Sequence, residues 1–257
     1  MEIILIIFFG ILGTIIGSFL NVCIDRLPAG KSLAYPPSAC DACQHRLTWL
    51  DLFPVFSYLF LRGRCRYCGA KIPQRVFWVE LGTGLLFALL FWRFGWKPIL
   101  PVSIVYCSAL IVIALIDLYH HLILNKIVYP FAIIAAVINF FIPGLFSLHN
   151  FLFGLLGGAV GFLILFLPAL IYSKGMGWGD VKMAGLMGLM VGFPNVIVAV
   201  FGGIILGGLM AVMLLIFKQK SRKQGIPFGP YLSIGAVIAI LWGSNIIHWY
   251  LHLAKME

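Results

Sequence analysis

Long apolar segments dominate this chain and constrain its fold more than any other feature. Eight of them follow one another, at about residues 3–22, 77–94, 98–116, 127–146, 150–172, 181–193, 195–217 and 229–251. A helix needs about 20 predominantly apolar residues to cross the hydrocarbon core of a bilayer. The sequence therefore predicts an all-α, polytopic integral membrane protein with about eight transmembrane helices. The segment 181–193 is too short to cross as a straight helix, so we expect it to be tilted or half-inserted.

The composition excludes several other classes of protein. Hydrophobic residues make up 62% of the 257 residues and charged residues only 10%, whereas soluble domains carry about 25% charged residues. Disordered chains, disulfide-rich secreted modules and collagen-like fibres are excluded on the same grounds.

The distribution of positive charge predicts the topology. Lysine and arginine total 18 against 8 acidic residues, and eight of the 18 lie within residues 26–75. The positive-inside rule places this loop in the cytoplasm, as it does the connections 117–126, 173–182 and 218–227. The last of these carries Lys218, Lys220, Arg222 and Lys223. The basic excess is thereby explained by topology, and we expect lipid but no nucleic acid as a partner.

Four of the six cysteines form two C-x-x-C pairs in the long loop, Cys40 with Cys43 and Cys65 with Cys68. Their separation is close to that of zinc-ribbon-like sites. Each x-x turn places two sulfurs on one side of a tight bend, so four thiolates can surround Zn²⁺ as a tetrahedron. A loop of this size has little core of its own, and a metal would supply its folding energy. We therefore predict a structural zinc site.

Two disulfides or four free thiols are the alternatives for these cysteines. The reducing cytoplasm argues against disulfides. A catalytic metal is not expected, because four cysteines leave no open coordination position. Cys23 and Cys107, which are isolated in or beside apolar segments, are interpreted as packed core residues.

Three of the eight acidic residues, Glu80, Asp117 and Asp180, lie within or at the edge of apolar segments. Ionisable residues are costly there, so each is a candidate functional residue. Asp117 ends the third segment, and Asp180 follows Gly177-Trp178-Gly179 and begins the sixth. In the predicted topology both aspartates fall at the cytoplasmic face, where they can meet. Glu80 is interpreted as a possible partner for a loop arginine.

A facing pair of carboxylates suits aspartyl proteolysis. The two do not both ionise at low cost, so one keeps a proton while the other acts as general base on a water molecule. The protonated member polarises the peptide carbonyl and then protonates the leaving amine. This mechanism needs no cofactor. Other interpretations remain open: Asp117 as a solvated helix end, Asp180 as an N-cap paired with Lys182, or the pair as part of a proton or cation pathway.

An ordered set of motifs resembles the type IV prepilin peptidases, bifunctional membrane enzymes of pilus biogenesis, type II secretion and DNA uptake. The motifs are Gly17-Ser18-Phe19-Leu20-Asn21-Val22, Arg26-Leu27-Pro28, Pro37-Ser38-x-Cys40-x-x-Cys43, Leu59-x-Leu61-Arg62-Gly63-x-Cys65-x-x-Cys68, Val79-Glu80-Leu81, Gly177-x-Gly179-Asp180 and Pro227-Phe228-Gly229-Pro230-Tyr231. The resemblance covers almost the whole chain.

The resemblance implies a G-x-G-D aspartyl protease whose catalytic pair is Asp117 and Asp180. Such an enzyme would remove the basic leader of prepilins or pseudopilins on the cytoplasmic side of the inner membrane. It would then N-methylate the new N-terminal residue with S-adenosylmethionine. In the family the cysteine loop is tied to methyl transfer, and its glycine before the second cysteine pair corresponds to Gly63.

Two functional regions follow from this resemblance. Residues 1–95, with the four-cysteine loop 26–75, are expected to be associated with methyl transfer, and residues 96–257 with a six-span peptidase. The alternatives are a peptidase without methyl transfer, against which the four cysteines and Gly63 argue, and a proton- or cation-coupled transporter. A transporter would call for carboxylates or broken helices near the bilayer midplane, whereas both aspartates are predicted at one face. The sequence leaves the oligomeric state open.

Overall fold

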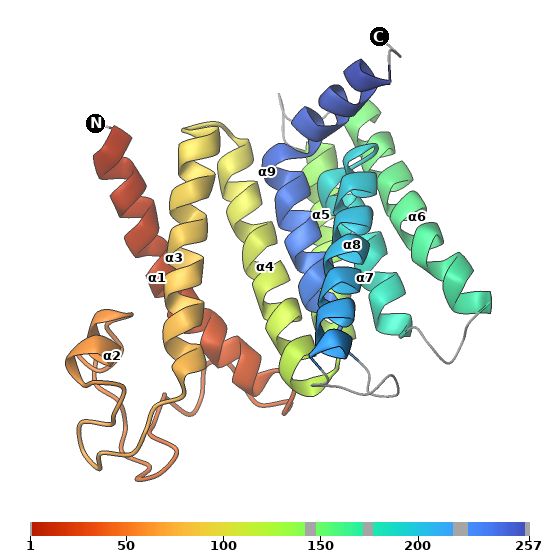
Figure 1. Cartoon of the computed structure of the whole chain (residues 1–257). Helices are drawn as coiled ribbons and strands as arrows, with labels where there is room; N and C mark the ends of the chain where they lie inside the picture. Colours follow the sequence, from red (N-terminus) through yellow and green to blue (C-terminus); the bar gives the residue numbers. More distant parts are fainter. Residues whose placement is uncertain (1, 142–147, 172–176, 218–225, 255–257) are drawn as a thin grey trace. The chain divides into compact units, whose positions relative to one another are not determined.

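The computed structural model describes residues 2–141, 148–171, 177–217 and 226–254 (Figure 1). The part so described is helical, with only two isolated β-bridges besides. The chain divides into two compact units, residues Met1–Ile104 and Val105–Glu257, each taken by itself below. The functional division expected from the sequence, 1–95 and 96–257, stays a prediction, because a division by structure does not assign activities to the parts.

The first unit is built on a pair of long helices, α1 (Glu2–Arg26) and α3 (Gln74–Phe94), which pack side by side (Figure 1). Small residues let the two backbones approach. A Cβ added to Gly13 would lie 2.8 Å from the Cα of Gly84, and one added to Gly17 would lie 2.9 Å from the Cα of Glu80. The four-residue glycine spacing in α1 is therefore a packing feature, as expected for membrane helices.

The loop between α1 and α3 contains one short helix, α2 (Phe56–Phe60). It also contains the two cysteine pairs, each on a small hairpin that is closed by one β-bridge, Ala39 with Arg46 and Arg64 with Lys71. One guanidinium nitrogen of Arg75, in the first turn of α3, donates to both carboxylate oxygens of Asp25, near the end of α1, at 2.6 and 2.7 Å. This ion pair joins the two helices where the loop leaves α1 and enters α3.

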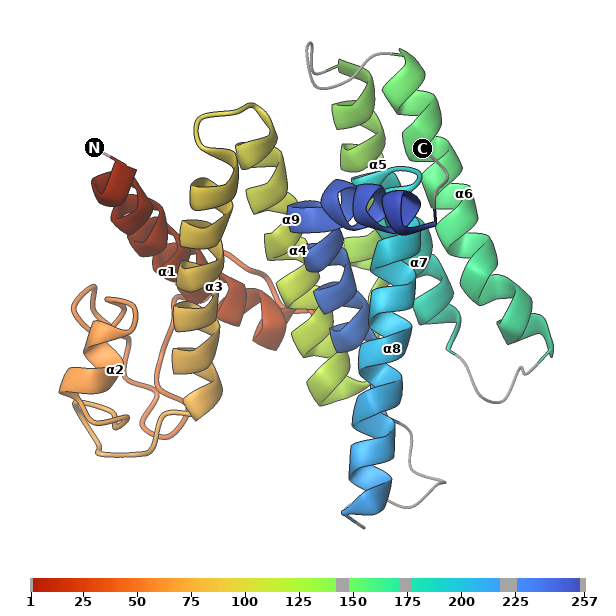
Figure 2. The same cartoon turned by 45° about the horizontal axis from the view of Figure 1, so that its top comes forward.

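The remaining helices are α4 (Ile99–His120), which crosses the division between the units, α5 (Asn125–Phe141), α6 (Leu148–Ile171), α7 (Trp178–Val191), α8 (Asn195–Ile216) and α9 (Gly229–Leu253). Within the second unit α6 packs on α7 and α8 on α9 (Figure 2). Glycines again line the contacts: a Cβ on Gly157 would lie 2.6 Å from the carbonyl oxygen of Gly188, and one on Gly203 would lie 2.9 Å from the Cα of Leu232.

Among the described residues, six helices are long and apolar enough to cross a membrane: α1, α3, α4, α6, α8 and α9. The chain is therefore a multi-pass membrane protein, but the expected count of eight spans is not confirmed. The apolar helix α5 has 17 residues, and its predicted range runs into residues 142–147, outside the described part. The helix α7 has 14 residues, half of them buried. The basic residues Lys218, Lys220, Arg222 and Lys223 also lie outside the described part.

Candidate active site and candidate metal centre

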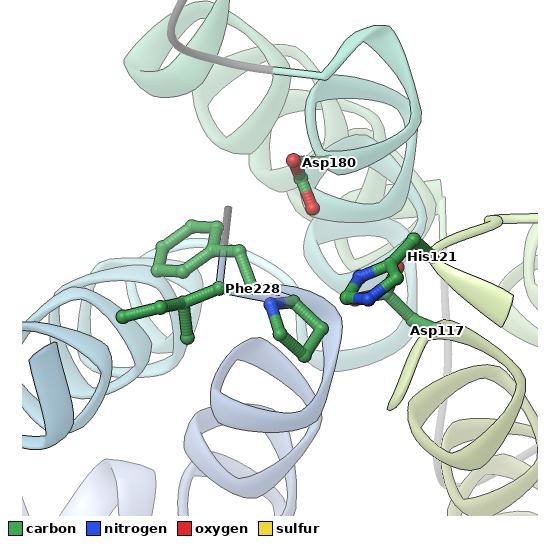
Figure 3. Close-up of a pocket in the computed structure, with 6 residues that line it drawn as sticks. Asp117, His121, Asp180 and Phe228 are labelled. Carbon is green, nitrogen blue, oxygen red and sulfur yellow. The ribbon is translucent and has the colours of Figure 1, made fainter. Parts of the chain in front are cut away.

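The two aspartates of the second unit line one cavity. Asp117 stands on the last turn of α4 and Asp180 on the first turn of α7. The cavity has a volume of about 340 Å³, and its lining consists of Asp117, His121, Asp180, Ile226, Pro227 and Phe228. Figure 3 shows these side chains arranged around a common space. The structure thus brings together the two carboxylates that the sequence singled out.

Gly179 explains how α7 comes so close to the end of α4. A Cβ at this position would lie 2.9 Å from the Cβ of Ile123, in the segment that follows α4. A larger residue at position 179 would therefore push the first turn of α7, and Asp180 with it, away from the cavity. The second glycine of the G-x-G-D motif is needed for this close approach.

Asp117 is held by the start of α9. It is buried, with 6% of its surface exposed, and its Oδ2 accepts a hydrogen bond of 2.8 Å from the backbone N–H of Gly229. A Cβ on Gly229 would lie 2.8 Å from that same Oδ2 and 3.0 Å from the Cβ of Asp117. Only glycine leaves room for the carboxylate to reach this N–H.

The sequence does not assign a role to His121 or to the segment 226–228, which line this cavity, or to Gly229, which donates to Asp117. His121 follows Asp117 by four residues, and its side chain lines the cavity. The signal for the other two was the Pro227–Tyr231 motif, whose proline and glycine mark a helix start. Which distant helix end such a start faces cannot be read from a motif.

The electrostatics of the pair follow from this arrangement. The negative charge of Asp117 acts on Asp180 across the cavity, so the two carboxylates interact. A pair of carboxyl groups that shares one proton in a partly desolvated site provides one base and one acid. The cavity also has room for a water molecule and part of a substrate chain.

The four cysteines of the first unit form the candidate metal centre. The sulfurs of Cys40, Cys43, Cys65 and Cys68 all lie within 4.8 Å of one another, and all four cysteines are free of disulfides. The Cys40 and Cys68 sulfurs are 3.8 Å apart. A tetrahedral Zn²⁺ with Zn–S distances of about 2.3 Å requires sulfurs about 3.8 Å apart. The donor set and its spacing fit a zinc ion held by four thiolates.

The two C-x-x-C turns have the same backbone geometry. In the first, Cys40 N–H donates to the carbonyl of His45 and Gln44 N–H donates to that of Cys40. In the second, Cys65 and Gly69 donate in the same pattern to Ala70 and Cys65. The residue after each second cysteine has positive φ, 57° at Gln44 and 71° at Gly69. In addition, backbone N–H groups of Cys43 and Ala42 lower the pKa of the Cys40 thiol to about 7.

Asp51 connects the turn before α2 to the second hairpin. Its carboxylate accepts hydrogen bonds from the N–H and hydroxyl of Thr48, from Tyr67, and from Arg66 at 2.7 Å. Burial raises the pKa of Asp51, but these hydrogen bonds outweigh it and bring the pKa to about 2. The ring centroids of His45 and Tyr67, one from each hairpin, lie 3.7 Å apart with the rings tilted by 35°. The hairpins are thus joined by side chains as well as by the cysteine cluster.

Glu80 and Gly63 have roles in the loop that the sequence did not foresee. Glu80 is 4% exposed and accepts a 2.7 Å hydrogen bond from the backbone N–H of Val55, where a loop arginine had been considered as its partner. Gly63 has φ +68°, and a Cβ there would lie 2.8 Å from the Tyr58 hydroxyl. Gly63 therefore sits at a tight junction between α2 and the second hairpin.

Comparison with known proteins identifies relatives over nearly the whole chain. Residues 11–94 match the bacterial peptidase A24 N-terminal domain, and residues 104–212 match the type IV leader peptidase family. A Bacillus subtilis protein named prepilin leader peptidase/N-methyltransferase is 34% identical, with 95% of this chain and 97% of the relative covered. Proteins of the same name from Stutzerimonas stutzeri and Pseudomonas aeruginosa are 32% and 33% identical, each with 96% of this chain and 93% of the relative covered. No solved structure matches.

Proposed function

This chain belongs to the type IV leader peptidase family, and we propose that it removes the leader of prepilins or pseudopilins and N-methylates the new N-terminus. Asp117 and Asp180 are the catalytic pair of this proposal. The observation that carries it is their meeting at one cavity, on helix ends that lie far apart in the sequence.

The roles of the two aspartates follow from their surroundings. Asp117 accepts the Gly229 N–H at the positive end of α9, an arrangement that stabilises a carboxylate. We therefore assign the base to Asp117 and the retained proton to Asp180. Asp117 takes a proton from water as the oxygen attacks the peptide carbonyl. Asp180 polarises that carbonyl with its retained proton and then donates this proton to the leaving amine as the C–N bond breaks, which leaves the pair with one proton, now on Asp117.

Methyl transfer belongs to the first region, residues 1–95, in this proposal. S-adenosylmethionine would supply the methyl group to the amine that cleavage exposes. The cysteines Cys40, Cys43, Cys65 and Cys68 would hold a structural Zn²⁺ that keeps the two hairpins together. Gly63 is the residue we assign to methyl transfer, and its contact with Tyr58 supports a role in shaping the loop.

The membrane placement is part of the same proposal. We place the loop 26–75 and the aspartate cavity on the cytoplasmic side of a bacterial inner membrane, with α5 and α7 completing eight inserted segments. The concentration of basic residues in the loop supports this orientation. A substrate leader on the cytoplasmic side would then reach both activities.

A two-activity assay tests the proposal. Purified protein is incubated with a prepilin and isotopically labelled S-adenosylmethionine, and the product is analysed by mass spectrometry. We expect a pilin that has lost its leader and gained one labelled methyl group on its N-terminal nitrogen. Cleavage without labelling would leave a peptidase that lacks methyl transfer, and an intact prepilin would contradict the proposal as a whole.

A further inference from the structure

An exposed apolar surface is formed by α2 and the residues just before it, in the loop that joins α1 to α3 of the first unit. None of the residues of α2 is buried. Phe60 is 85% exposed and Trp49 is 75% exposed. We call this surface the α2 patch; it consists of Trp49, Leu52, Phe53, Phe56, Leu59 and Phe60.

Two contacts fix the α2 patch alongside the first turns of α3. The N–H of Val55, which precedes α2, donates to Glu80 at 2.7 Å, and the rings of Tyr58 and Phe77 lie 5.2 Å apart. Glu80 is six residues after Gln74, where α3 begins, and so lies about 9 Å along the helix axis. In both views α2 runs beside this end of α3 (Figures 1 and 2).

The backbone at Val55 is bent to reach this position. Val55 has φ 63°, in the left-handed region that a β-branched residue rarely adopts. Such a conformation persists only where its surroundings hold it, and the hydrogen bond to the buried Glu80 carboxylate does so here. The turn directs α2 along α3, with Tyr58 against Phe77 and with Phe56 and Phe60 exposed.

We propose that the α2 patch is an interfacial membrane anchor, inserted at the boundary between lipid headgroups and acyl chains. The helix α3 is long and apolar enough to span the bilayer, so the region beside its first two turns belongs to the interface. Tryptophan and phenylalanine are favoured at that depth. In water these large apolar side chains would stay in contact with solvent, whereas insertion at the interface would bury them.

The charges beside the α2 patch complement an anionic bilayer surface. The stretch 26–75 contains eight basic residues and only two acidic ones, Asp41 and Asp51, and Asp51 is already paired with Arg66. Arg62 and Arg64 follow α2 directly and are exposed. Basic residues next to an inserted apolar face are the pattern of helices that lie in the membrane interface.

Spin labels on the full-length protein in lipid nanodiscs test the anchor. The nanodiscs contain phosphatidylcholine and phosphatidylglycerol, and the label is attached to Phe60→Cys or, as a control in the same loop, to Ala34→Cys. Both positions are exposed, so neither label displaces a packed side chain, and zinc content checks that the loop is intact. Collisions with oxygen report lipid, and collisions with a water-soluble nickel chelate report water.

We expect the label at position 60 to collide more with oxygen than with the nickel chelate, and the label at position 34 to show the reverse. A label at position 60 that is as open to nickel as the control would place the α2 patch in water. A label shielded from both reagents would mean that protein covers it. Shielding that appears only when prepilin is added would make the patch a substrate surface, and each of these three results overturns the anchor.

These experiments distinguish a failure of the membrane-anchor proposal from a failure of the proposed function. The collision measurement needs no substrate, methyl donor or activity. A protein without peptidase activity can still insert α2 in the interface, and an active protein can still expose it to water.

Discussion

At the scale of single residues, the candidate active site depends on two glycines as much as on two aspartates. Gly179 leaves room for Ile123, which lets α7 approach the end of α4. Gly229 leaves room for the carboxylate of Asp117. In both cases the missing side chain makes room for a group from a distant part of the chain. The glycines decide where the aspartates lie.

Replacing Gly229 by alanine should disable cleavage. The new Cβ would lie 2.8 Å from Oδ2 of Asp117 and force the carboxylate to move. A displacement of about 1 Å in a catalytic group can cost about 10²-fold in rate, and we expect a loss of that order in kcat for leader removal. Methylation of a pilin that already lacks its leader should remain near the wild-type rate.

Gly208→Ala is the matched control for this substitution. It is also a helical glycine of the second unit, but a Cβ there meets no atom within 4 Å. We expect wild-type cleavage from it. Wild-type cleavage by Gly229→Ala as well would show that Asp117 does not need the position that Gly229 gives it.

The residues of the site were only partly predictable from the sequence. Asp117 and Asp180 could be found because a carboxylate at the edge of an apolar segment is conspicuous. The hydrogen bond from Gly229 and the contact of Gly179 with Ile123 could not, because they join segments whose packing no local pattern specifies. Glu80 illustrates the same limit: its charge suggested an arginine, and its partner is the backbone N–H of Val55.

At the scale of elements, the helices were predictable and the loop was not. The apolar run 3–22 became α1, Glu2–Arg26, and 229–251 became α9, Gly229–Leu253. Length and hydropathy suffice for such helices. The short helix α2 has only five residues and is positioned by Glu80 and Phe77 of α3, so its place depends on tertiary contacts. The number of membrane crossings depends on the short helix α7, because its 14 residues are too few to span a bilayer as a straight helix.

Replacing one cysteine of the cluster should remove the proposed zinc ion and, with it, methyl transfer. In Cys65→Ser one thiolate of the proposed zinc tetrahedron is missing, and the two hairpins lose the metal ion that they share. We expect loss of bound zinc, measured by elemental analysis, and at least a tenfold loss of methyl transfer. Leader removal should persist, since Asp117 and Asp180 lie in the second unit.

Cys107→Ala controls for the loss of a thiol as such. Cys107 is buried outside the cysteine cluster, so this variant should keep its zinc. The zinc assignment would be contradicted by a Cys65→Ser protein that binds as much zinc as the wild type.

The Asp51 contact predicts a pH dependence of the loop. The pKa of Asp51 is about 2 in the folded loop and 3.8 ordinarily, so the ionised form is favoured by folding. Its stabilisation should be fully present above about pH 4 and disappear as the pH falls toward 2. Because Arg66 is 45% exposed, we expect only about 1 kcal/mol from these contacts.

The measurement compares zinc release from the wild type and from Asp51→Asn between pH 7 and pH 3. Protonation of the thiols affects both proteins alike, so the difference between them reports Asp51. We expect a constant difference at neutral pH that shrinks below about pH 4, and no difference for Asp25→Asn, which belongs to α1 and pairs with Arg75 of α3. A difference that grows on acidification would contradict the assignment.

At the scale of the whole molecule, the chain combines an apolar helical scaffold with few ionisable groups. Only eight acidic residues occur in 257, and two of them line one cavity of the second unit. The first unit holds a four-cysteine cluster on a loop between membrane helices. In our account these are two chemical centres, one for hydrolysis and one associated with methyl transfer.

Leader cleavage by Asp117→Asn and Asp180→Asn tests the central claim most directly. Asparagine keeps the size of each side chain and removes its acid–base function. We predict that each variant loses cleavage by about 10²- to 10⁴-fold, while both still methylate a pilin supplied without its leader and Asp25→Asn cleaves like the wild type. Cleavage of the prepilin at the wild-type rate by either variant would contradict the aspartyl mechanism.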